Sequence, residues 1–214
     1  MRIGIDFDNT VACYNGVFHA AALERGLIPA DLPNDRQSVR DFLRAQGRDA
    51  DFTVLQGYVY GARMDLVTLY PGFVETLQEL VAAGHILYLV SHKTQQAIAG
   101  PPYDLHSAAR GFLEARKLIG TANGLRPENV FFELTKEDKV TRALALGCEV
   151  FIDDLPEILE MSAVRDHMRA ILFDPEGHFE RQQGAVDSIE HYASWREIGE
   201  ALRYRPSGGK RDRD

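Results

Sequence analysis

Residues Arg2 to Thr10 read Arg-Ile-Gly-Ile-Asp-Phe-Asp-Asn-Thr, a short apolar run that ends in two carboxylates and a threonine. An extended chain points alternate side chains to opposite faces, which places the two isoleucines on one face and leaves Asp6 and Asp8 sharing another. The stretch therefore predicts a buried strand that delivers two carboxylates into a loop.

Two neighbouring carboxylates favour a particular chemistry. They repel one another and resist joint ionisation unless a cation lies between them or one keeps a proton. Mg²⁺ binds oxygen ligands and usually takes one or two protein carboxylates. That leaves one carboxylate free to attack as a nucleophile and the other to pass a proton. The same short pattern also occurs in capped turns, so the rest of the chain has to decide between the two interpretations.

Composition limits the class of protein. The chain has 214 residues and a mass of 24.0 kDa, with 45% hydrophobic and 26% charged residues, which predicts one globular domain or a core domain with a modest insertion. A formal charge of −8 argues against a nucleic-acid surface or an anionic membrane partner. The N-terminal apolar run is too short for a secretory signal, and no run approaches membrane-spanning length.

The cysteines indicate a reducing compartment. Cys13 and Cys148 lie far apart in the sequence and form neither a disulfide framework nor a zinc-ligand spacing. We expect two reduced, buried thiols in a cytoplasmic protein. The oligomeric state is not predicted by any pattern in the chain.

Hydrophobic periodicity divides the chain into helices and strands. Helices are expected over 11–25, 36–46 and 50–63, and no strand is expected between residues 11 and 69, so this region is interpreted as a helical insertion. Beyond it, helices are expected over 73–83, 105–118, 135–146 and 194–202, strands over 86–90, 130–132, 149–152 and 169–173, and a disordered tail over 205–214.

Polar residues follow several of these strands. Ser91 comes directly after the strand at 86–90, and Asp153 and Asp154 follow the strand at 149–152. Ligands of parallel α/β sheets bind outside the carboxyl ends of the strands, so we expect these residues to lie near Asp6 and Asp8. Lys136 and Lys139 belong to the first turn of the expected helix 135–146.

With these pieces in place, the sequence resembles the haloacid dehalogenase superfamily of phosphohydrolases over most of its length. That superfamily carries Asp-x-Asp-x-Thr, a Ser or Thr, a Lys and an acidic pair, in that order. The resemblance implies an α/β fold, with a Rossmann-like parallel sheet flanked by helices and a small all-helical cap. Residues 1–10 and 70–204 would form the core and residues 11–69 the cap.

The resemblance also implies roles for individual residues. Asp6 would attack phosphorus and form an aspartyl-phosphate, and Asp8 would protonate the leaving oxygen and then activate water. The expected phosphate-binding residues are Thr10, Ser91, His92 and Lys139, with Lys136 as the alternative lysine. The expected Mg²⁺ ligands are Asp6, the backbone carbonyl of Asp8, Asp153 and Asp154.

Three functions remain open at this stage. Asp8 favours phosphate ester hydrolysis over dehalogenation, because a halide leaving group needs no proton. The first hypothesis is therefore a Mg²⁺-dependent phosphomonoesterase acting on a small metabolite such as a sugar phosphate or nucleotide. A phosphotransferase or mutase and a non-catalytic binding protein are the alternatives. Substrate selection is expected in the cap, where Tyr58, Tyr60 and Arg63 are candidates, and in the segment that contains His92 and Lys93.

Overall fold

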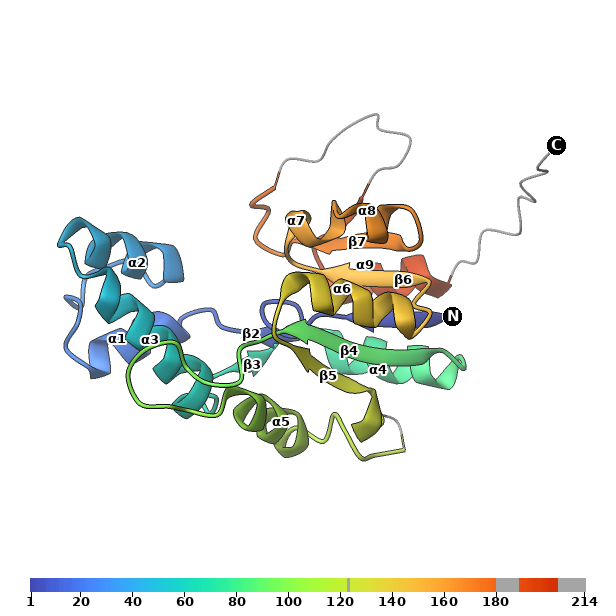
Figure 1. Ribbon diagram of the computed structural model, residues 1–214, viewed down its shortest axis with the longest axis horizontal. Helices are drawn as coiled ribbons and strands as arrows, with labels where there is room; N and C mark the ends of the chain where they lie inside the picture. The colour runs from blue at the N-terminus through green and yellow to red at the C-terminus, as the bar shows by residue number, and fades with distance from the viewer. Residues whose placement is uncertain (123, 180–188, 204–214) are drawn as a thin grey trace.

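The computed structural model describes residues 1–122, 124–179 and 189–203. Six parallel strands form one sheet in the order β5-β4-β1-β6-β7-β8 (Figure 1). The strands are β1 (Arg2–Ile5), β4 (Ile86–His92), β5 (Val130–Glu133), β6 (Val150–Asp153), β7 (Arg169–Phe173) and β8 (Glu190–Tyr192). The expected α/β fold with a parallel sheet is confirmed, and the first motif lies on a central strand.

Helices cover both faces of the sheet, because alternate strand residues point in opposite directions. Leu87 and Leu89 of β4 belong to one apolar cluster, with residues of α4 (Phe73–Ala82), α5 (Leu105–Ala115) and α9 (Trp195–Arg203). Val90 points into a second cluster, formed with α6 (Lys136–Ala145), α7 (Pro156–Leu159) and α8 (Ser162–Arg165). Because the strands are buried on both faces, their sequences are continuous apolar runs, and polar residues occur at their carboxyl ends.

The cap consists of three helices, α1 (Val17–Glu24), α2 (Arg36–Ala45) and α3 (Asp49–Ala62). They lie beyond the carboxyl ends of the core strands, at the left of Figure 1. The expectation that residues 11–69 contain no strand is wrong. β2 (Ala12–Cys13) pairs antiparallel with β3 (Thr68–Leu69), so two short strands join the cap to the core.

The first cap helix begins later than the apolar pattern predicts. Gly16 precedes it with φ of 76°, a left-handed conformation that a right-handed helix does not contain. The chain after the first motif instead forms a turn, in which the N–H groups of Val11 and Ala12 both donate to the carbonyl of Phe7, and then the short strand β2. The helix at 11–25 is therefore shortened at its start.

Other elements begin or end a few residues away from their predicted boundaries. β4 continues through Ser91 and His92, which the sequence pattern had placed after the strand. The short elements β8, α7, α8 and the 3₁₀ helix η1 (Pro127–Asn129) were not predicted, because they have too few residues to show a period. The tail expected to be disordered, 205–214, lies outside the described residues.

The two cysteines are buried, as expected. Cys13 and Cys148 are buried free thiols, and burial raises the pKa of Cys148 to about 12. In the part of the chain that the structure describes, no helix has both the length and the apolar character that a membrane span requires.

Candidate active site

Three parallel strands bring the predicted residues to one edge of the sheet. Asp6 follows β1 directly, and its N–H donates to the carbonyl of Ile152 in the neighbouring strand β6. Asp153 is the last residue of β6, and Ser91 lies near the end of β4 on the other side of β1. Because all three strands run in the same direction, their carboxyl ends converge on one site.

Lys139 joins the carboxylates of two strands. Its Nζ lies 2.5 Å from Oδ1 of Asp6, to which it donates a hydrogen bond. The same Nζ forms an ion pair with Oδ2 of Asp153, at a distance of 2.6 Å. The lysine side chain is only 2% exposed. One buried cation thus lies between two buried carboxylates.

The charges of the site perturb one another. Burial raises the pKa of Asp6 to about 7, with smaller contributions from Asp153 and Asp8, while the charge of Lys139 opposes this rise. The pKa of Asp154 is also raised, by burial and then by Asp6 and Asp153. Burial acts to lower the pKa of Lys139, but the two carboxylates beside it outweigh that effect and raise it. The site therefore holds more acidic groups than one lysine neutralises.

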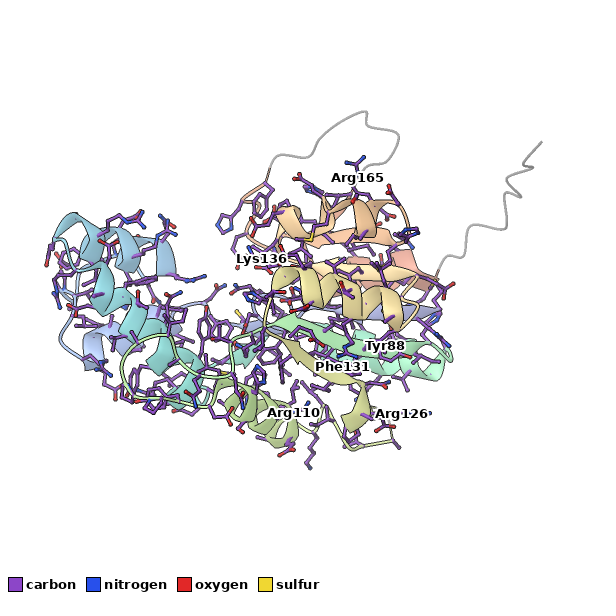
Figure 2. The ribbon with its side chains drawn as sticks, viewed as in Figure 1. Tyr88, Arg110, Arg126, Phe131, Lys136 and Arg165 are labelled. Carbon is purple, nitrogen blue, oxygen red and sulfur yellow. The ribbon has the colours of Figure 1, made fainter. Side chains whose placement is uncertain are left out.

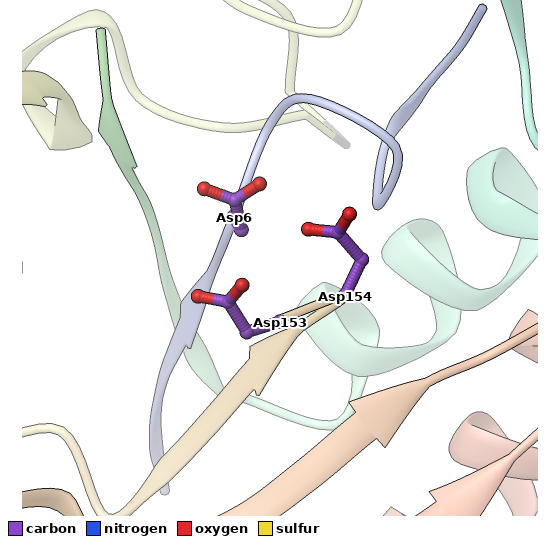
Figure 3. A group of neighbouring side chains, drawn as sticks. All are labelled: Asp6, Asp153 and Asp154. Atoms are coloured by element: carbon purple, nitrogen blue, oxygen red, sulfur yellow. The ribbon is translucent and has the colours of Figure 1, made fainter. Parts of the chain in front are cut away.

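Asp6, Asp153 and Asp154 form the acidic group that a cation fits (Figure 3). Each offers a carboxylate oxygen, and these oxygens all lie within 4.8 Å of one another. An all-oxygen donor set of this kind suits a hard divalent ion such as Mg²⁺. The raised pKa of Asp154 supports that fit, because a bound cation stabilises the ionised carboxylate.

Asp8 is held at both of its carboxylate oxygens. Tyr14, from the segment that leads into the cap, donates its hydroxyl to Oδ1 at 2.6 Å. Lys93, which follows β4, donates from Nζ to Oδ2 at 2.7 Å. Both partners are buried, with Lys93 5% exposed, and Nζ of Lys93 lies 4.7 Å from the ring centroid of Tyr60. Lys93 of the core and Tyr14 of the segment that leads into the cap therefore together position Asp8, the predicted acid and base.

A cavity of about 330 Å³ lies between this edge of the sheet and the cap. Asp6, Asp8 and Asp154 line it, together with Ser91, His92 and Lys139. On the cap side it is lined by residues of α3 and by Arg36 of α2. The predicted nucleophile therefore faces a partly open cavity between core and cap.

The predicted phosphate-binding residues are placed differently from one another. Oγ of Ser91 is buried and has no hydrogen-bond partner among the described residues, which is typical of a group that meets a ligand. His92 lines the cavity, and burial lowers its pKa. Thr10 is not brought to the cavity: its side chain is fully buried, and its carbonyl accepts from Nε1 of Trp195.

The two candidate lysines occupy distinct environments. Lys136 is partly exposed and pairs with Glu157, and Figure 2 shows it at the end of α6 that faces the cap. Lys139 lies in the same first turn of α6 and points into the acidic group. Thr135 caps this helix by accepting from the N–H of Asp138, which fixes the first turn that carries both lysines. The geometry favours Lys139 as the phosphate-binding lysine, and its role stays a prediction.

The sequence predicts Lys93 as a candidate for substrate contact beside the phosphate site, and not as a partner of Asp8. It assigns no role to Arg36. The period-two alternation of a strand places residues 91 and 93 on the same face, and that signal would have directed Lys93 toward the site. Arg36 lies in the cap, where only the folded chain shows which helix face meets the cavity.

Comparison with known proteins shows the fold but not the activity. No family model and no curated protein matches the sequence. Among solved structures, a predicted phosphatase from Clostridium acetobutylicum aligns with a TM-score of 0.59 and 16% identity, over 94% of this chain and 97% of its own. A HAD family hydrolase from Deinococcus radiodurans, solved with bound phosphate and sodium, aligns with a TM-score of 0.55 and 19% identity over 94% of each chain.

A third neighbour carries a different activity in its name. The protein tyrosine kinase A of Mycobacterium tuberculosis aligns with a TM-score of 0.61 and 18% identity, over 94% of this chain and 97% of its own. At these identities the comparisons establish a common fold alone. The chain has the fold of the haloacid dehalogenase superfamily, and its function must be argued from the side chains of the site.

Proposed function

We propose that this chain is a Mg²⁺-dependent phosphomonoesterase that hydrolyses a small phosphorylated metabolite through an aspartyl-phosphate on Asp6. The observation that carries the proposal is the position of Asp6: a buried carboxylate on the central strand, 2.5 Å from Lys139 and beside Asp153 and Asp154, on the floor of a cavity. Phosphoryl transfer needs a nucleophile surrounded by positive charge and by donors for the phosphoryl oxygens.

In the first step, an oxygen of Asp6 attacks phosphorus, and the bond from phosphorus to the ester oxygen breaks. Asp8 donates a proton to that leaving oxygen, so the product departs as an alcohol. In the second step, Asp8 accepts a proton from water as the water oxygen attacks phosphorus. Orthophosphate leaves, and the carboxylate of Asp6 is restored.

The remaining residues bind and orient the phosphoryl group. The hydroxyl of Ser91 and the ammonium of Lys139, which line the cavity, would hold its oxygens. Asp6, Asp153 and Asp154 would hold the metal, with the backbone carbonyl of Asp8 as a further ligand. Bound there, Mg²⁺ would neutralise charge on the phosphoryl group. The cap covers the cavity and excludes bulk water from these contacts.

The test is phosphate release from sugar phosphates, nucleotides and an aryl phosphate, with and without Mg²⁺. We expect release to require the metal and to be lost in Asp6→Asn, with Asp31→Asn, an exposed cap residue, as the matched control. Release that survives in Asp6→Asn would contradict the nucleophile assignment. Transfer of the phosphoryl group to an added alcohol in preference to water would favour a phosphotransferase, and no turnover of any ester would favour a binding protein.

A further inference from the structure

One basic side chain of the cavity differs from the others in having no acidic partner. The basic side chains that line the cavity are Lys93, Lys136, Lys139 and Arg36. Each of the three lysines is paired with a carboxylate. Arg36 makes no hydrogen bond or ion pair within the described part of the chain, and its guanidinium lies over the ring of Phe18, 5.0 Å from the centroid. Arg36 is thus available to an incoming anion.

Arg36 also lines a second cavity, of about 550 Å³. The two cavities share Asn9, Arg36, Asp154 and Leu155 as lining residues. They therefore adjoin at the boundary between cap and core, with Arg36 at their junction. A substrate whose phosphate lies at Asp6 can extend past this guanidinium toward the second cavity.

A second arginine strengthens the positive charge at this position. Arg40 lies four residues after Arg36 in α2, on the same helix face, and lines the second cavity. The Arg40 side chain is 40% exposed, and its Nε forms an ion pair with Oδ1 of Asp41 at 3.5 Å. The Nε atom itself is buried and makes no hydrogen bond within the described residues. A buried N–H donor without an acceptor costs free energy that a ligand oxygen would recover.

Three of the four acidic residues that line the second cavity, Asp35, Asp174 and Glu176, are engaged by donors, and the fourth, Asp154, belongs to the acidic group that would hold the metal. Asp35 accepts from both the N–H and the hydroxyl of Ser38 at the start of α2, and these bonds lower its pKa. Asp174 accepts from two backbone N–H groups, and Glu176 accepts from the side chain of Asn15. These carboxylates are satisfied, whereas Arg36 has no acidic partner and Nε of Arg40 lacks a hydrogen-bond acceptor within the described residues.

We propose that the substrate carries a second anionic group on its leaving part, a carboxylate or a further phosphate, and that Arg36 binds this group with Arg40 beside it. The inference rests on the proposed function, since it takes the reacting phosphate to lie at Asp6. A guanidinium offers two parallel N–H donors, which match the paired oxygens of a carboxylate or phosphate. Arg36 therefore selects among phosphate esters by the charge of the alcohol that leaves.

The test compares pairs of esters that differ only in the second charge. Glycerol phosphate and phosphoglycerate differ in a terminal carboxylate, and a fructose monophosphate and its bisphosphate differ in a second phosphate. Binding is measured by calorimetry on Asp6→Asn, which keeps the cavity but cannot form the aspartyl-phosphate. Phosphate release is measured in parallel on the chain with Asp6 intact. Both measurements are repeated with Arg36→Gln, Arg36→Lys and the control Arg44→Gln, which lies on α2, pairs with Asp49 and lines neither cavity.

We expect the ester with the second anion to bind about ten- to a hundredfold more tightly than its neutral counterpart. Arg36→Gln should remove this preference by raising KM while kcat changes little, Arg36→Lys should keep part of it, and Arg44→Gln should keep all of it. The pair of esters with the larger difference in affinity identifies the second group: carboxylate for the glycerol pair and phosphate for the fructose pair. Equal binding within both pairs, or a preference that survives in Arg36→Gln, would overturn the inference.

Failure of the proposed function would have a different signature. If no ester releases phosphate but phosphoglycerate still binds in an Arg36-dependent way, the anion site stands and the phosphatase assignment falls. If phosphate is released with no preference for the second charge, the phosphatase assignment stands and the anion site falls.

Discussion

Nζ of Lys93 lies 2.7 Å from Oδ2 of Asp8, so a buried cation from the end of β4 holds the predicted acid and base in place. Tyr14 fixes the other carboxylate oxygen from the side of the cap. With both oxygens held, the carboxylate has one orientation toward the cavity. A proton donor contributes only when it is within reach of the leaving oxygen, so its position is part of its activity.

Lys93→Met and Tyr14→Phe should each lower kcat for an alkyl phosphate by about ten- to a hundredfold. The reason is that an alkoxide leaves poorly unless Asp8 is placed to protonate it. For a nitrophenyl phosphate, whose leaving group needs no proton, the loss should be about threefold or less. Phosphate release from the two esters gives the comparison.

The matched control is Tyr88→Phe, a half-buried tyrosine of β4 that lines neither cavity and is labelled in Figure 2. It should leave both rates unchanged. Equal losses on the alkyl and the aryl ester would show that Lys93 and Tyr14 support the fold of the site rather than the placement of Asp8.

Lys139→Met should destabilise the metal-free protein by about 3–5 kcal/mol at neutral pH. The substitution leaves Asp6 and Asp153 buried without the cation that lies between them. Lys136→Met removes only a partly exposed pair with Glu157, so its effect should stay below about 1 kcal/mol. Urea denaturation of both variants measures the difference, and similar losses in the two would refute the assignment of Lys139 as the buried bridge.

The metal-free protein should lose stability as pH rises from about 4 to about 7. Burial raises the pKa of Asp6 to about 7, so the folded chain keeps a proton that the unfolded chain has already released above pH 4. The folded state binds more protons across this window, and the free energy of unfolding therefore falls with rising pH. Asp6→Asn should make this fall shallower and leave the part that the raised pKa of Asp154 contributes, as followed by thermal unfolding in the presence of a chelator.

The shift of Tm on adding Mg²⁺ tests the same carboxylates from the metal-bound side. A cation bound by Asp6, Asp153 and Asp154 stabilises their ionised forms, so added Mg²⁺ should raise Tm more at pH 8 than at pH 5. Asp31→Asn should respond like the native chain. A stability profile that rises between pH 4 and 7 without metal would contradict the raised pKa of Asp6.

Local patterns were sufficient to place the predicted site residues on the right elements. Apolar runs identified β1, β4 and β6, and the polar residue at or after the end of each run reached the common edge of the sheet. Pairing between distant segments was not visible in the same way. β2 and β3 have two residues each, too few to show an alternation, and they pair only because the cap returns to the core.

Contacts between elements show features of the site that the sequence pattern does not predict. Lys136 and Lys139 share one helix turn, and the burial of only one of them distinguishes the two. The ion pair of Lys93 with Asp8 joins two strands, and Arg36 reaches the cavity from a cap helix. Strand alternation directs Lys93 toward the site, but its pairing with Asp8, the burial of Lys139 and the position of Arg36 each depend on how two elements pack.

Gly61→Ala should destabilise the chain by about 1–3 kcal/mol and alter KM, because a methyl group there would overlap the side chain of Tyr103. Gly61 and Gly57 lie on one face of α3, and at Gly57 an added Cβ would come 2.7 Å from Cβ of Ala97. The segment after β4 thus packs closely on the cap, and Ala97 also lines the cavity. Separating the two surfaces should reshape the substrate site.

Gly111→Ala in α5 is the control: nothing lies within 4 Å of its added Cβ, so it should stabilise the helix by about 0.4–1 kcal/mol. Urea denaturation and KM for the best ester test both variants, and a Gly61→Ala protein as stable and as active as Gly111→Ala would show that the cap does not depend on this contact.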